Sequence, residues 1–253
     1  MVMTDKATFA PRGSRASKFR QLGLYQGAEP TRTWKPGKVW VARDGIFAKT
    51  PKCLNSYAPF ESHLESLGHL LLSVDPRIQY YVCQPNPLLY WMESNDSGRV
   101  RREYTPDFIA LNKDERLFAI DTKASYFAEA DQWVSRVAAI RQAYRFDHGV
   151  ELLVWTERDL YAEPRLSNAR TMYRHRHAPQ DPSSEYTVRR TLEAHGGVSS
   201  IGQLCEEASI EARCQMAEAF GSVMRLGLAG EVVLASGAKY GRNTEVRFNE
   251  AAE

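Results

Sequence analysis

Two short stretches of sequence decide the fold: TPDFIAL at residues 105–111 and LFAIDTK at residues 117–123. Both runs are rich in apolar, aromatic and β-branched residues, which favour strands. The polar residues 112–116 lie between them and are typical of a turn. The pattern therefore predicts two antiparallel strands joined as a hairpin centred on Asp114.

This hairpin would bring two aspartates together. In the predicted register Asp107 lies opposite Asp121, and Ile109 lies opposite Ala119. Side chains alternate between the two faces of a strand, so Asp121 and Lys123 share a face, and Asp107 joins them. Directly opposed residues have Cβ atoms about 5 Å apart. The sequence therefore predicts a cluster of two carboxylates and one lysine.

Such a cluster suits metal-assisted hydrolysis of a phosphodiester. Two carboxylates this close repel each other, and a hard divalent cation such as Mg²⁺ would offset the repulsion with oxygen ligands at about 2.0–2.1 Å. Lys123 could then act on a water molecule or neutralise a phosphate oxygen. The alternative is a structural hairpin in which Lys123 forms salt bridges with both aspartates.

An upstream helix, predicted over residues 59–73, offers a third carboxylate. Its apolar stripe recurs every three or four positions, at Phe60, Leu64, Leu67, Leu71 and Val74. Glu65 borders this stripe and is the expected metal ligand, whereas Glu61, one turn earlier, is expected to be solvated or to cap the helix. We expect His69 to be a surface or hydrogen-bonded structural histidine, with a role in the site as the alternative.

Strand and helix patterns alternate around these motifs, which indicates an α/β fold. Strands are predicted at residues 78–84, 88–92, 100–104 and 150–155, and helices at residues 129–146 and 163–176. The fully apolar run 150–155 is expected at the centre of the sheet. We divide the chain into a basic N-terminal segment (1–58), a catalytic domain (59–176), a Pro/Ser-rich linker (177–184) and a C-terminal domain (185–253).

The C-terminal domain has the outline of a winged helix. Helices are predicted at 184–195, 200–208 and 212–226, with a hairpin at 231–235 and 244–248. Ser184 is one predicted N-cap and either Ser199 or Ser200 is the other, and Gly196 and Gly227 are the predicted helix ends. From residue 184 onward seven Lys and Arg face ten Glu, a net charge of −3. Because recognition helices are usually basic, both protein docking and DNA contact remain open.

The charge distribution points to nucleic acid at the other end of the chain. The 253 residues carry a net charge of +2, but residues 1–58 alone carry +8 and include Trp34 and Trp40. Basic and aromatic residues in alternation suit a phosphate backbone. The alternatives are a solvated arm or, for residues 33–52, a segment that packs on the core.

Several classes of protein are disfavoured. No apolar run approaches the ~18 residues of a membrane span, and the first residues lack the apolar region of a secretory signal, so we expect a cytoplasmic protein without a membrane partner. The four cysteines form no CxxC pair, which argues against a zinc ribbon or a disulfide framework. Neither a P-loop nor a GxSxG motif is present.

Taken in order, the motifs resemble those of TnsA-type endonuclease subunits of heteromeric transposases, a branch of the PD-(D/E)xK superfamily. The resemblance covers residues 59–176 closely and the C-terminal domain loosely. The matching motifs are SHLE (62–65), LLLSVDP (70–76), CQP (83–85), YTPDF (104–108) and IDTK (120–123). The resemblance implies a restriction-endonuclease-like core, with a mixed central sheet flanked by helices.

The resemblance also implies roles for individual residues. Glu65, Asp107 and Asp121 would bind Mg²⁺, which Mn²⁺ could replace, and Lys123 would act on the attacking water. Gln84 matches a Gln-Pro element that we interpret as structural. The implied activity is hydrolysis of one strand, on the 5′ side, at each end of a transposon.

The implied partners are double-stranded DNA, a DDE-class transposase and an AAA+ regulator that contacts the C-terminal domain. Two alternatives remain open. One is a self-standing PD-(D/E)xK nuclease of a restriction or defence system, and the other is a non-catalytic DNA-binding assembly subunit.

Overall fold

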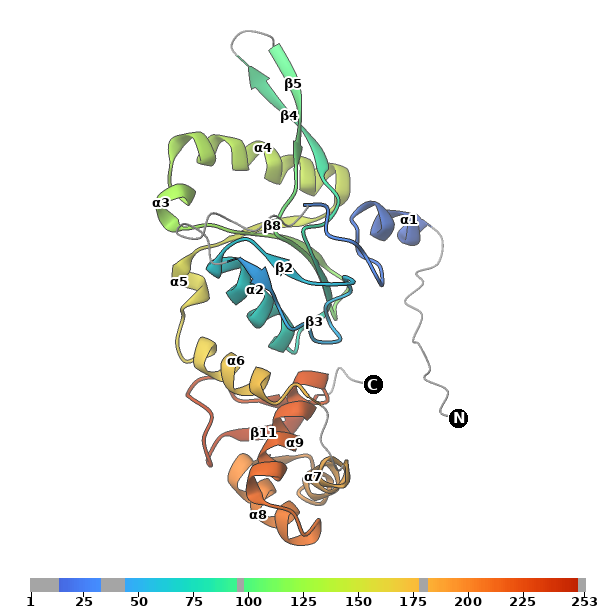
Figure 1. Ribbon diagram of the computed structural model, residues 1–253, viewed down its shortest axis with the longest axis vertical. Coiled ribbons are helices and arrows are strands. Elements are labelled where there is room, and N and C mark those ends of the chain that lie inside the picture. Colours follow the sequence, from blue (N-terminus) through green and yellow to red (C-terminus); the bar gives the residue numbers. More distant parts are fainter. Residues whose placement is uncertain (1–13, 33–43, 95–97, 178–181, 250–253) are drawn as a thin grey trace. The chain divides into compact units, whose positions relative to one another are not determined.

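The computed structural model describes residues 14–32, 44–94, 98–177 and 182–249 (Figure 1). The chain divides into two compact units, one within residues 1–69 and 78–159 and the other within residues 70–77 and 160–253. Helix α6 (Arg165–Arg174) therefore groups with the C-terminal unit, and the division falls earlier than the predicted boundary at residue 177. Half of the predicted linker, residues 178–181, lies outside the described residues.

The first unit is built on a four-stranded mixed sheet. Its order is β3 (Ile78–Cys83), β6 (Phe108–Asn112), β7 (Leu117–Thr122) and β8 (Glu151–Trp155). The first three strands are antiparallel, and β8 runs parallel to β7. Within β6 and β7, Ile109 pairs with Ala119 and Leu111 with Leu117, so the predicted hairpin register is confirmed. The α/β class, with a mixed sheet flanked by helices, is confirmed as well.

Strand β8 corrects the prediction that residues 150–155 form the centre of the sheet. Among the four strands of this sheet, β8 lies at an edge, with Glu151 exposed and only Leu152 of the strand buried. Every residue of β6, by contrast, is buried. A short apolar run shows that a strand packs against something, but not whether it has a neighbour on both sides.

Helix α4 (Asp131–His148) covers one face of this sheet (Figure 1). Its buried residues Val137, Ile140 and Tyr144 share a core with Ile109 and Ala119 of the hairpin. The helix predicted at residues 129–146 is thus confirmed, shifted by two residues at each end. The helix ends at Gly149, whose φ of 57° is left-handed, as glycine at this position permits. A short helix, α3 (Ser125–Ala128), precedes it.

The first half of helix α2 (His63–Val74) lies against the opposite face. Gly68 permits this close approach, because a Cβ atom there would lie 2.7 Å from the ring of Phe108. The helix begins later than predicted: residues Pro59–Phe60 form strand β2, which pairs with β1 (Gly45–Ile46). Ser62 accepts a hydrogen bond from the backbone of Glu65 and so fixes the start of the helix.

Strands β4 (Leu88–Ser94) and β5 (Gly98–Tyr104) form a separate two-stranded hairpin that extends beyond α4 (Figure 1). Both strands were predicted, and residues 95–97 of their turn lie outside the described residues. The base of the hairpin packs on α4, where Arg136 donates to the hydroxyl of Tyr90 over 2.9 Å.

Part of the basic N-terminal segment belongs to the core. After α1 (Ser14–Gln21), Leu22 and Leu24 are buried together with Phe19 of the helix, and they pack with residues of the sheet and of α4. Residues 14–32 are therefore not a solvated arm. Trp34 and Trp40 lie outside the described residues, and their predicted role stays a prediction.

The second unit consists of helices and a small sheet. It contains α6, α7 (Ser183–Ala194), β9 (Val198–Ser200), α8 (Ile201–Glu211), α9 (Met216–Ala229), β10 (Val232–Leu234) and β11 (Glu245–Phe248). The strands form an antiparallel sheet in the order β10-β11-β9. Helix α5 (Glu157–Leu160) is a single turn at the boundary between the two units. The helices and the hairpin match their predictions, and β9 is additional.

The caps of this unit are predicted only in part. Ser200 caps α8 by accepting from Gln203, as predicted. Ser184 is not an N-cap, since it lies inside α7 and shares a hydrogen bond of 2.7 Å with Ser222. Gly227 does not end α9. The helix continues to Ala229 and stops at Gly230, with a φ of 77°.

Gly227 instead lets other elements approach. A Cβ atom there would lie 2.8 Å from both Leu234 and Met172.

Over the described ranges, no helix is long and apolar enough to cross a membrane.

Candidate active site

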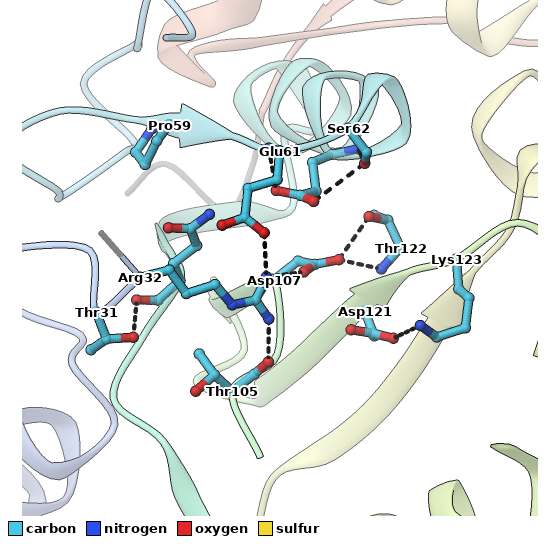
Figure 2. Close-up of polar contacts among 12 residues, drawn as sticks. Thr31, Arg32, Pro59, Glu61, Ser62, Thr105, Asp107, Asp121, Thr122 and Lys123 are labelled. Carbon is cyan, nitrogen blue, oxygen red and sulfur yellow. Dashed lines mark hydrogen bonds and ion pairs between the residues drawn. The ribbon is translucent and has the colours of Figure 1, made fainter. Parts of the chain in front are cut away.

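The predicted carboxylates and lysine lie at one end of the β6–β7 hairpin (Figure 2). Asp107 directly precedes β6, Asp121 lies near the end of β7, and Lys123 follows that strand. Asp121 Oδ2 is 3.6 Å from Lys123 Nζ. Both aspartates are only 5% exposed, so their charges are largely removed from water.

Asp107 is fixed by the opposite strand. Its Oδ2 accepts hydrogen bonds from the backbone N and the Oγ1 of Thr122, each over 2.7 Å. The hairpin ladder ends at the pair of Phe108 and Ile120, so the carboxylate of Asp107 turns toward Thr122 instead of standing directly opposite Asp121. Thr122 was not singled out from the sequence, although its place between Asp121 and Lys123 could have suggested it.

Glu65 joins the cluster from the first turn of α2. Its Oε2 accepts from the backbone N of Glu61 over 2.9 Å, and its Oε1 accepts from Ser62 Oγ over 3.2 Å. This resembles a capping box, in which a glutamate reaches back to the start of its helix. Glu65 is thus the glutamate that caps the helix, and Glu61, whose side chain is exposed, is solvated, which is one of the two outcomes expected for it.

Arg32 is the cation that sequence reasoning missed. Its Nη2 donates to the carbonyl of Thr105 over 2.8 Å, and its Nη1 lies 3.3 Å from Asp107 Oδ1 and 3.4 Å from Glu61 Oε2. Figure 2 shows the guanidinium among these three groups. In the sequence, Arg32 was one of eleven basic residues within a segment read as a DNA arm, and no motif distinguished it.

The carboxylates influence one another strongly. Burial, followed by the charge of Asp107, raises the pKa of Glu65 to about 7 and the pKa of Asp121 to about 6. Arg32 lowers both values, and Lys123 lowers that of Asp121. Glu65 and Asp121 thus hold their protons to higher pH than in water, because Arg32 and Lys123 do not fully offset burial and the charge of Asp107.

The donor chemistry of this cluster fits a hard cation, but its oxygens do not converge on one point. Within the described residues, no group of three or more His, Cys, Asp or Glu is arranged to hold a metal ion. Glu65 is engaged by its helix cap, and Asp107 by Thr122 and Arg32. Asp121 Oδ2, in contrast, is buried and has no hydrogen-bond partner in the described part of the chain. Metal binding would therefore require side chains to reorient.

Lys123 is oriented by contacts on two sides. Its Nζ lies 4.2 Å from the ring centre of Trp133 on α4, a cation–π distance. Its backbone N donates to the carbonyl of Trp155 over 2.9 Å, across the parallel pair of β7 and β8. Trp133 lies within the helix predicted at residues 129–146, and nothing in its spacing indicated the lysine.

Gln84 and His69 make structural hydrogen bonds near the site. Gln84, with a φ of 43°, donates its backbone N to the carbonyl of Asp107 over 2.7 Å. His69 is fully buried, with Nε2 at 3.2 Å from the carbonyl of Pro59 and Nδ1 at 3.2 Å from the hydroxyl of Tyr81. Burial lowers its pKa to about 4. His69 is thus a hydrogen-bonded structural histidine, as predicted from the sequence.

Comparison with known proteins does not assign a function to this site. No family model matches the chain, and no curated protein matches it significantly. What the protein does must therefore be argued from the geometry and chemistry of its own residues.

Proposed function

We propose that the protein is a Mg²⁺-dependent DNA endonuclease with a restriction-endonuclease-like core. The observation that carries the proposal is the cluster of three buried carboxylates, Glu65, Asp107 and Asp121, beside Lys123. Buried carboxylates this close destabilise a fold, and a cluster of that kind with an adjacent lysine is typical of a functional site. Asp121 Oδ2 accepts no hydrogen bond within the described residues and has only the 3.6 Å ion pair with Lys123, which leaves it open to a new ligand.

Each residue has a defined task in such a reaction. Glu65, Asp107 and Asp121 would hold the cation, which would supply an activated water and stabilise charge on the phosphate. Lys123, held between Asp121 and Trp133, would position that water or neutralise a phosphate oxygen. Thr122 keeps the carboxylate of Asp107 in place through two hydrogen bonds.

The β4–β5 hairpin supports DNA as the substrate. On its exposed face, Trp91 is 49% exposed, and the guanidinium of Arg99 lies 5.8 Å from the centre of the Trp91 ring. Arg101, also exposed, pairs directly with Trp91 across the strands. Arginines with an exposed aromatic ring bind phosphates and stack on bases. The hairpin leads through Thr105 into Asp107, so DNA bound there would be close to the carboxylates.

The finer proposal is a TnsA-type subunit that cuts the 5′ strand at transposon ends. Its partners would be a DDE-class transposase and an AAA+ regulator. The second unit's element order, α7, β9, α8, α9, β10 and β11, supports a winged-helix domain. Its negative charge supports docking to the AAA+ protein rather than to DNA.

One observation favours a second candidate, a non-catalytic DNA-binding subunit. Arg32 pairs with Asp107 and so neutralises a proposed metal ligand. In that case the hairpin would still bind DNA, but no metal would bind to the carboxylates.

A cleavage assay separates these candidates. Supercoiled plasmid is incubated with the full chain in Mg²⁺ or Mn²⁺, alone and with its partner transposase. We expect metal-dependent nicking that Asp107→Ala abolishes while DNA binding is retained. Asp114→Asn, in the exposed turn of the same hairpin, is the matched control and should remain active. Full activity of Asp107→Ala, or no cleavage under any of these conditions, would refute the endonuclease. Cleavage that needs no partner would favour a self-standing nuclease.

A further inference from the structure

We propose that Arg32 is a built-in counter-cation that competes with the divalent metal ion for Asp107. The inference rests on the proposed metal-dependent function and adds a residue that limits metal binding. It starts from the position of the guanidinium, which contacts Asp107, Glu61 and the carbonyl of Thr105 (Figure 2). A metal ion shared by the carboxylates would need part of this space.

The hydrogen bonds of the carboxylates show why Arg32 would control access of a metal ion to Asp107. Asp107 Oδ2 is held by two hydrogen bonds from Thr122, and both oxygens of Glu65 are held at the start of α2. Asp121 Oδ2 has no hydrogen-bond partner within the described ranges. Asp107 Oδ1 is the oxygen that Arg32 contacts. Once Arg32 moves, a shared ion could thus use Asp107 Oδ1 and Asp121 Oδ2 without disturbing the strand or the helix cap, and it would displace only the 3.6 Å ion pair of Asp121 with Lys123.

The contacts of Arg32 are suited to such a movement. Its distances of 3.3 Å to Asp107 and 3.4 Å to Glu61 are longer than the roughly 2.7–2.9 Å of a strong charge-assisted hydrogen bond. The 2.8 Å bond to the Thr105 carbonyl is short and involves no charge on its acceptor. The side chain is 32% exposed, so solvent can receive it. The guanidinium can therefore turn away from the carboxylates about its bond to Thr105.

The same geometry explains why the carboxylates do not converge in the absence of metal. One positive charge among them offsets part of their repulsion and keeps Asp107 turned toward Arg32. A divalent ion would offset more charge, but it would also repel the guanidinium while that remained beside Asp107. Arg32 therefore stabilises the metal-free protein and weakens metal binding.

The test measures metal binding directly and does not depend on catalysis. Free Mn²⁺ is followed by electron paramagnetic resonance while the full chain is titrated, for wild type, Arg32→Gln and Arg32→Lys. Removing one positive charge about 5 Å from a divalent ion should tighten Mn²⁺ binding about tenfold. We expect this for Arg32→Gln and a much smaller change for Arg32→Lys, which keeps the charge. Arg116→Gln is the control, since Arg116 pairs with the exposed Glu151.

Thermal unfolding without metal provides a second readout. Arg32→Gln should unfold at a lower temperature than wild type in EDTA and gain more stability from Mn²⁺. Unchanged or weaker Mn²⁺ binding by Arg32→Gln would overturn the inference, provided that Asp107→Asn shows the wild-type protein to bind Mn²⁺ through Asp107. Mn²⁺ binding that is insensitive to Asp107→Asn would refute the proposed metal site itself. Absence of binding in both wild type and Arg32→Gln would overturn both proposals.

Discussion

Replacing Asp121 by asparagine should stabilise the metal-free protein while removing a proposed metal ligand. In the folded state, burial and the charge of Asp107 raise the pKa of Asp121 from 3.8 to about 6. The folded protein thus binds this proton more tightly than the unfolded chain does. The charged carboxylate therefore destabilises the fold as pH rises from about 4 to 6, and the penalty is complete above that range.

The magnitude follows from the size of this shift. Each pKa unit corresponds to about 1.4 kcal/mol, so the penalty is about 3 kcal/mol at pH 7.5 and about 1 kcal/mol at pH 4.5. Asparagine has the same shape and no charge. We expect Asp121→Asn to raise the free energy of unfolding by up to about 3 kcal/mol at pH 7.5, and by about 2 kcal/mol less at pH 4.5.

Urea denaturation in EDTA at the two pH values measures this difference. Asp147→Asn serves as the control, because Asp147 is exposed and its change should stay within about 0.5 kcal/mol. Millimolar Mg²⁺ should narrow the gap by stabilising the wild-type protein alone. If Asp121→Asn were no more stable than wild type at pH 7.5, the carboxylate would not be under electrostatic strain and the reasoning would fail.

Three further predictions concern α2 and its neighbours. Gly68→Ala should destabilise the protein by about 1–3 kcal/mol, measured by urea denaturation, because its Cβ would lie 2.7 Å from Phe108; an unchanged midpoint would contradict this packing. His69, with its pKa lowered to about 4, favours unfolding when protonated, so stability should fall by about 3 kcal/mol between pH 7 and 4. His69→Gln should be less stable at pH 7 but show a shallower acid slope, and an identical slope would exclude this histidine as its source. In the plasmid assay, Glu65→Gln should lose far more activity than Glu61→Gln, and the reverse order would make Glu61 the ligand.

The hairpin arginines make a separate prediction about DNA. The double substitution Arg99→Ala and Arg101→Ala should weaken binding to duplex DNA and reduce the slope of log affinity against log salt by about 2. Fluorescence anisotropy across a salt series measures this. Arg158→Ala, which removes an exposed arginine paired with Glu129, is the control. An unchanged slope would show that the hairpin does not contact phosphates.

The local parts of the fold could be predicted from sequence because their signals are local. The turn centred on Asp114 sets the register of β6 and β7, and the position of Gly149 fixes the end of α4. Gly227 was misread, because a glycine required for close packing resembles one that ends a helix. The edge position of β8 depends on sheet order, which a single apolar run does not encode.

In the candidate site, too, the residues brought together by local sequence were predicted, and those brought together by long-range contacts were not. Asp107, Asp121 and Lys123 belong to one hairpin, so their spacing alone predicted that they lie close together. Arg32 reaches the site through contacts with residues 73 and 75 positions away, and no periodicity reports such a contact. The capping role of Glu65 was not predicted, because both glutamates lie close to the helix start and a cap was considered only for Glu61.

The spread of these residues along the chain has a consequence for folding kinetics. The bond between Asp107 and Thr122 closes a loop of 15 residues, whereas the bond between Arg32 and Thr105 closes one of 73. Short loops close first, so we expect the acidic hairpin to form before the guanidinium arrives. A refolding chain then passes through a stage in which the two aspartates lie together with Lys123 but still without Arg32. Added salt or divalent cations should speed refolding by lowering the energy of that stage.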